Sequence, residues 1–136
     1  MTVREYRQQI AGEWVRRTFG PQALSPRERV KRLIEEATEL AQAEGLQAYE
    51  IYQIADVVFR RPVGSPEQEV GGVSLTLLAY CYAKDFSADE LEDLELQRVL
   101  SKSADHFRRR QNEKAALGIS EPGLKPTDEA PDPLGR

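Results

Sequence analysis

Three glutamates, Glu35, Glu36 and Glu39, lie close together in a segment with helical periodicity. At about 100° per residue, a helix projects all three side chains into one arc. Like charges at this spacing repel one another, and a bound cation would reverse that effect. Oxygen ligands of this kind suit Mg²⁺ or Mn²⁺, which also engage substrate phosphates. The alternative is a solvated acidic face that pairs with the basic residues one turn earlier.

A fourth carboxylate, Glu69, falls in the first turn of another predicted helix, which is almost continuously apolar over residues 73–83. A charge at the start of a buried helix is costly unless it is paired or coordinated. The alternative is that Glu69 interacts favourably with the dipole at the helix N-terminus. Both interpretations stay open from these residues alone.

Composition limits the class of protein. The chain has 136 residues, 40% hydrophobic and 31% charged, which is typical of one soluble globular domain. It contains no apolar run of membrane-spanning length, and its N-terminus lacks the pattern of a signal peptide. We therefore expect a cytoplasmic protein with no membrane contact. The formal net charge of −4 disfavours general nucleic-acid binding, and Cys81, within the apolar run, is expected to be a buried structural thiol.

Repeated N-cap signals predict helices along the whole chain. Each combines Ser or Thr with Glu or Gln three residues later: Thr2 with Glu5, Ser25 with Glu28, Ser65 with Gln68, and Ser87 with Glu90. Pro26 and Pro66 fall in first helical turns, where a missing N–H costs nothing. Because no alternating segment rich in Val, Ile and Thr is present, we expect an all-α fold, a compact bundle of about five helices.

We expect these helices at residues 3–19, 26–44, 47–59, 66–84 and 87–116. Residues 1–118 should form a single helical domain, and the proline-rich residues 119–136 a disordered or surface-draped tail. The fourth helix is apolar on nearly all sides and needs neighbours all round. We therefore expect a homo-oligomer, either a homodimer or a homotetramer.

The acidic residues resemble the motifs of a known protein family. Residues 29–40, RVKRLIEEATEL, resemble the first acidic motif, EExxE, of the MazG-like all-α nucleoside triphosphate pyrophosphohydrolases. Glu69-Val70-Gly71-Gly72 stands where that family has its second motif, ExxD, so Gly72 replaces an expected Asp. The segment is similar to a MazG-like subgroup, met in phage and bacterial genomes, in which Glu-Val-Gly-Gly is expected. The resemblance covers roughly residues 14–110.

The resemblance implies Mg²⁺-dependent hydrolysis of a canonical or non-canonical (deoxy)nucleoside triphosphate to the monophosphate and pyrophosphate. By the same resemblance, Glu36, Glu39 and Glu69 would be metal ligands. Glu35 would be a further ligand or the catalytic base that orients the attacking water. The replacement of Asp by Gly72 leaves the number of metal ions open.

Triphosphate binding also requires cations. Lys102, Arg108 and Arg109 lie late in the predicted fifth helix, much as the family places basic residues after its last motif. The alternative is that these residues complement the helix dipole. Trp14 is a candidate for contacting the base or sugar, although a lone Trp on an apolar helix side is usually a core residue. The alternative function is a non-catalytic helical relative that binds nucleotides or proteins, with Gly72 marking lost hydrolysis.

Overall fold

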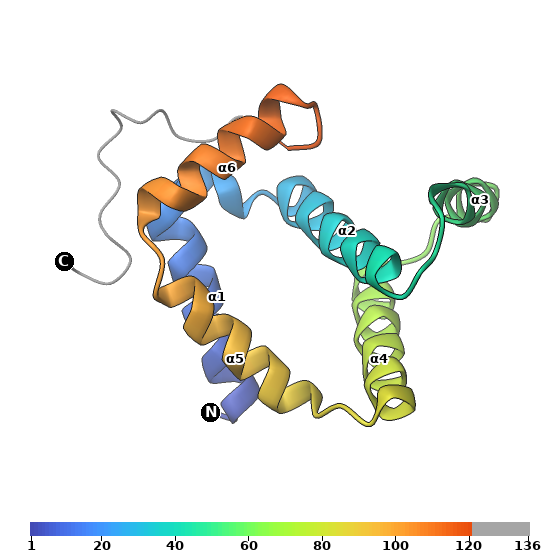
Figure 1. The fold of residues 1–136 in the computed structure, drawn as a ribbon, viewed down its shortest axis with the longest axis horizontal. Coiled ribbons are helices and arrows are strands. Elements are labelled where there is room, and N and C mark those ends of the chain that lie inside the picture. Colours follow the sequence, from blue (N-terminus) through green and yellow to red (C-terminus); the bar gives the residue numbers. More distant parts are fainter. Residues whose placement is uncertain (121–136) are drawn as a thin grey trace. The chain divides into compact units, whose positions relative to one another are not determined.

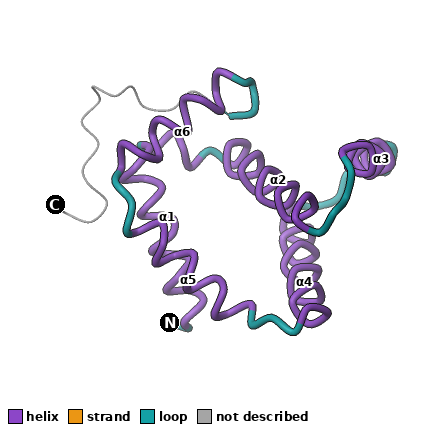
Figure 2. Tube along the Cα trace, viewed as in Figure 1, coloured by secondary structure: helices purple, strands orange, loops and turns teal. Residues whose placement is uncertain are grey.

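A computed structural model describes residues 1–120, and all regular secondary structure in that part is helical (Figure 2). Its α-helices, in chain order, are α1 (Val3–Phe19), α2 (Pro26–Ala43), α3 (Ala48–Phe59), α4 (Pro66–Lys84), α5 (Ala88–Leu100) and α6 (Ala104–Ala116), with a 3₁₀ helix, η1 (Pro21–Leu24), between α1 and α2 (Figure 1). The all-α prediction is confirmed. None of these helices is long and apolar enough to cross a membrane. The predicted tail beyond residue 120 lies outside the described residues.

The four predicted N-caps, at the starts of α1, α2, α4 and α5, are confirmed. Thr2 and Glu5 form a full capping box, in which Thr2 Oγ1 accepts from the Glu5 amide at 3.1 Å and Glu5 Oε2 accepts from the Thr2 amide at 2.6 Å. The hydroxyls of Ser25, Ser65 and Ser87 likewise accept from the amide three residues later. These side chains satisfy backbone donors that a helix N-terminus leaves without partners.

The predicted helix 87–116 is instead two helices. The Ser101 hydroxyl donates to the Arg98 carbonyl at 2.7 Å near the end of α5. Two residues later, Ser103 Oγ accepts from the His106 amide at 3.3 Å and caps α6. Serine side chains compete with helical backbone bonding and favour helix ends, so the Ser-Lys-Ser sequence allows the chain to change direction.

The described chain divides into two compact units. Within residues 1–120, unit 1 contains residues 1–37 and 96–120, and unit 2 contains residues 38–95. The division falls within α2 and within α5.

Unit 1 has a small aromatic core between α1, η1 and α6. Val15, Phe19 and Ala23 are buried, and Trp14 and Phe107 pack against them. The Trp14 ring makes edge-to-face contacts with Phe19 and Phe107, with centroids 5.7 and 4.9 Å apart. Such contacts stabilise aromatic cores beyond simple burial. Trp14 is therefore a partly buried residue that packs against this core.

Unit 2 buries little apolar surface by itself. Within residues 38–95, Cys81 is the buried hydrophobic residue, as predicted for its thiol. Many large apolar side chains of α3 and α4 are exposed, among them Phe59, Val70, Leu75 and Tyr82. The enclosure predicted for α4 is therefore not supplied by residues 38–95.

A polar cluster joins the end of α2 to the end of α4 in unit 2. Glu44 Oε1 accepts from Tyr80 Oη and lies near Lys84 Nζ, both at 3.1 Å. Hydrogen bonds from Lys84 and Tyr80 hold the pKa of Glu44 below its ordinary value of 4.5. The same bond to Glu44 raises the pKa of Lys84 above 10.5. Both charges are therefore favoured at neutral pH.

Thr18 offers a test of the unit 1 core. Its side chain is 0% exposed, and its Oγ1 has no hydrogen-bond partner in the described part of the chain. A buried hydroxyl without a partner opposes folding, so Thr18→Val should leave the free energy of unfolding unchanged or raise it by about 1 kcal/mol. Urea unfolding would measure the change, and Thr18→Ala, which removes a packed methyl group, should lower it. A loss of more than about 1 kcal/mol in the valine variant would show that the hydroxyl is bonded.

Candidate functional site

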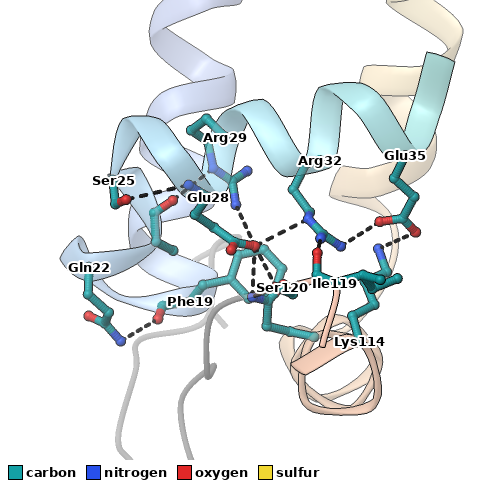
Figure 3. A network of polar contacts seen from close by, with 12 residues as sticks. Phe19, Gln22, Ser25, Glu28, Arg29, Arg32, Glu35, Lys114, Ile119 and Ser120 are labelled. Carbon is teal, nitrogen blue, oxygen red and sulfur yellow. Dashed lines mark hydrogen bonds and ion pairs between the residues drawn. The ribbon is translucent and has the colours of Figure 1, made fainter. Parts of the chain in front are cut away.

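Glu28 lies at the centre of a buried polar network between α2 and α6. Its side chain is 1% exposed. Its Oε1 accepts hydrogen bonds from Gln111 Nε2 at 3.0 Å and Ser120 Oγ at 2.6 Å (Figure 3). Arg29 NH2 is 4.0 Å from the same oxygen, and burial lowers the pKa of Arg29 although Glu28 opposes the effect. The buried carboxylate is thus surrounded by donors and cations.

Arg32 connects Glu28 to the acidic motif. Its Nε lies 3.2 Å from Glu28 Oε1, close enough for an ion pair, but makes no hydrogen bond to any of residues 1–120. Its NH1 donates to Glu35 Oε2 at 2.5 Å, and its NH2 donates to the Ile119 carbonyl (Figure 3). The guanidinium is therefore held on three sides, and Arg geometry suits such forked contacts.

Glu35 is already paired through both of its oxygens. While Oε2 accepts from Arg32, Oε1 is 3.0 Å from Lys114 Nζ on α6 (Figure 3). The side chains of Glu35 and Lys114 are only 18% and 22% exposed, so the pair is shielded from water. In this arrangement Glu35 is engaged as an ion-pair partner, although the resemblance implies a ligand or a catalytic base.

The other two motif carboxylates face solvent. Glu36 and Glu39 are both exposed on α2. Three residues apart on a helix, they share one side. The motif is therefore divided, with Glu35 turned toward α6 and the other two accessible.

Glu69 lies in the first turn of α4, after the N-cap Ser65, and is exposed. Its Oε1 sits against Gly64, where an added Cβ would collide with it. On the other side, a Cβ added at Gly72 would meet only Glu69 Oε2, at 4.0 Å. A side chain at position 72 therefore has room and would lie beside the Glu69 carboxylate.

These carboxylates limit how a metal could be held. Within residues 1–120, no group of three or more His, Cys, Asp or Glu side chains is gathered closely enough to hold a metal ion. Mg²⁺ commonly uses only one or two protein carboxylates and completes its shell with water and substrate phosphates. Glu36 and Glu39 fit this smaller requirement, since both are exposed on one side of α2.

The predicted phosphate-binding cations have different positions. Arg108 is buried, its Nε donates to the Thr18 carbonyl at 3.0 Å, and its NH1 is 3.6 Å from Asp105. It therefore connects α6 to α1. Lys102, in the turn before α6, and Arg109, on α6, are exposed and accessible to an anion.

Sequence reasoning missed the residues that organise this region. Glu28 was expected only as the second half of a capping box, and its bond to Gln111 joins residues 83 positions apart. Lys114 received no role, although it is the α6 cation next to Glu35. No local spacing rule relates α2 to α6, so the sequence held no usable signal for this network.

Comparisons with known proteins add no relative. No protein-family model, curated protein or solved structure matches this chain. The likeness of residues 29–40 to the EExxE motif thus stays a resemblance, and the contacts described above are the independent evidence about function.

The network predicts a strong effect of Glu28→Gln on stability. The substitution keeps the shape of the side chain but removes the buried negative charge that faces Arg29 and Arg32. Losing one partner of a buried pair should lower the free energy of unfolding by about 3 kcal/mol, measured by urea unfolding. Glu13→Gln is the matched control because Glu13 pairs with Arg17 at 3.8 Å on the surface, and it should cost less than about 1 kcal/mol. Equal effects would contradict the central role of Glu28.

Proposed function

We propose that this chain is a cytoplasmic, Mg²⁺-dependent nucleoside triphosphate pyrophosphohydrolase that works as a homo-oligomer. The observation that supports it most directly is the exposed pair Glu36 and Glu39 on one side of α2. These are the residues that the EExxE resemblance assigns to metal binding. The substrate would be a (deoxy)nucleoside triphosphate, and the products its monophosphate and pyrophosphate.

The proposed roles follow from accessibility and charge. Glu36 and Glu39 would hold Mg²⁺ together with the substrate phosphates, and Glu69 is the third proposed ligand. The ion, when bound, supplies neutralisation of the phosphates and acidification of a water molecule. Lys102 and Arg109 are exposed cations that could balance charge on the leaving pyrophosphate. No covalent intermediate is needed.

A second candidate function is a non-catalytic relative that binds nucleotides or proteins. Two observations favour it. Gly72 stands where the family motif has Asp, and residues 1–120 gather no group of three candidate ligands. The same residues would then bind an anion or a single cation without turnover.

Glu36→Gln and Glu39→Gln test the first proposal. Each should reduce Mg²⁺-dependent pyrophosphate release at least about 100-fold, because a lost metal ligand costs at least as much as a lost supporting contact. Release would be measured over a panel of nucleoside triphosphates, with circular dichroism to verify helix content. Glu113→Gln, an exposed carboxylate on α6, should retain activity. Near wild-type activity in either motif variant would refute the metal-site assignment.

Gly72→Asp separates the two candidate functions. There is room for the new side chain beside Glu69, so the variant should fold. An active natural enzyme should bind Mg²⁺ more tightly after the change without requiring it for turnover. A degenerate binder should instead gain hydrolysis. A stable variant with unchanged Mg²⁺ affinity, measured by calorimetry, would contradict the placement of Glu69 at the metal site.

The homo-oligomer is proposed because the apolar faces of α2, α3 and α4 are uncovered. Val30, Leu33 and Ile34 of the amphipathic α2 stripe are exposed, as are the α3 and α4 residues named above. Exposed large apolar side chains in this number are typical of a protein with an association site. A second copy is the natural occupant because a self-complementary apolar face closes a symmetric dimer without another component.

Leu75→Glu should therefore dissociate the oligomer. Leu75 is 69% exposed within one chain, so the charge is harmless in a monomer but unfavourable in a buried interface. Analytical ultracentrifugation should show a smaller species than the wild type. Gln68→Glu adds the same charge to an exposed polar position of α4 and should leave the mass unchanged. A wild-type monomer would contradict the proposed association.

A further inference from the structure

Lys114 is the α6 cation that lies against the acidic motif. Its Nζ is 3.0 Å from Glu35 Oε1, and the pair is largely shielded from solvent (Figure 3). Arg108, which precedes it on the same helix, is instead buried against the Thr18 carbonyl. Of these two α6 cations, Lys114 is therefore the one that contacts the acidic motif, and the spacing of the motif residues does not predict it.

The two cations on Glu35 are held very differently. Arg32 also contacts Glu28 and the Ile119 carbonyl, so its position is fixed by three groups. Lys114 is joined to Glu35, and its ammonium ends a flexible four-carbon stem with three rotatable donors. Lys114 can therefore leave Glu35 while Arg32 keeps the carboxylate in place.

We propose that Lys114 is a triphosphate-binding residue that neutralises Glu35 until the nucleotide arrives. This proposal rests on the proposed function. When the triphosphate binds, Lys114 moves from Glu35 to a phosphate oxygen, and the negative charge of Glu35, no longer neutralised by the lysine, favours a divalent cation at Glu36 and Glu39. Lysine binds phosphate as a point charge, and a triphosphate offers more negative charge than one carboxylate.

The ion pair between Lys114 and Glu35 also reduces charge repulsion within the acidic motif when no nucleotide or metal is bound. Three carboxylates at this spacing repel one another when no cation is present. Pairing of Glu35 with Lys114 removes one of these charges from the group. When Lys114 and Glu35 separate, neither charge is left without a counterion, because the lysine meets a phosphate and the glutamate lies near the divalent cation.

Lys114→Met and Lys114→Arg test the proposal. Without nucleotide, Lys114→Met should bind Mg²⁺ about tenfold more tightly than the wild type, measured by calorimetry, because the competing cation is gone. The same variant should bind a non-hydrolysable triphosphate analogue about tenfold more weakly, whereas Lys114→Arg should keep most of that affinity. Arg110→Met, which removes an exposed α6 cation outside the ion pair with Glu35, should leave Mg²⁺ affinity unchanged.

The two affinities of the Lys114 variants distinguish a triphosphate-binding role from a purely structural one. A Lys114→Met variant with a lower melting temperature but unchanged affinity for both Mg²⁺ and the analogue would overturn the proposal and leave Lys114 a structural residue. If that variant does not fold, Lys114→Gln provides the same two affinities, because glutamine can still donate a hydrogen bond to Glu35. The expected affinity changes in a chain that hydrolyses no nucleotide would support the role of Lys114 and refute only the pyrophosphohydrolase activity.

Discussion

The buried carboxylate of Glu28 is the interaction on which the polar side of unit 1 depends. A buried charge is costly unless donors and cations surround it, and here Gln111, Ser120 and Arg32 supply them. Those partners come from α6, from the residues after it and from α2 itself. The hydrogen bonds to Glu28 therefore hold α6 next to α2, and in that position Lys114 lies beside Glu35. Glu28, to which no catalytic role is assigned, thus positions residues that are proposed to act on the substrate.

The charges that sum to the net charge of −4 are unevenly distributed along the chain. Residues 38–95 contain twelve acidic and three basic residues, whereas the described part of unit 1 contains fourteen basic and seven acidic residues. Glu35 lies in the basic part and has two cationic partners. Glu39 and Glu69 lie in the acidic part, where a divalent cation would relieve repulsion. The proposed association of two copies through unit 2 would have to overcome the same repulsion, so the apolar faces would have to supply its driving force.

Local signals predicted most of the secondary structure. Thr2 and Ser65 cap helices as expected because an N-cap depends only on the next three residues. The break before α6 was missed because Ser103 is followed three residues later by His106, so only half of a capping box is present. The long-range network could not be predicted, because Glu28 and Gln111 are 83 residues apart and neither has a spacing that identifies the other.

The candidate site shows the same limit more sharply. The spacing of the motif glutamates placed all three in one arc of the helix. In the structure, Glu35 differs from Glu36 and Glu39 because it contacts Lys114 on α6. The register of α6 on α2 decides this outcome. Gln111 and Lys114, three apart and on one side of α6, contact Glu28 and Glu35. A shift of α6 by one residue would place Glu113 opposite Glu35 and replace attraction with repulsion. The favourable pairing of Lys114 with Glu35 therefore reinforces the register that Glu28 imposes.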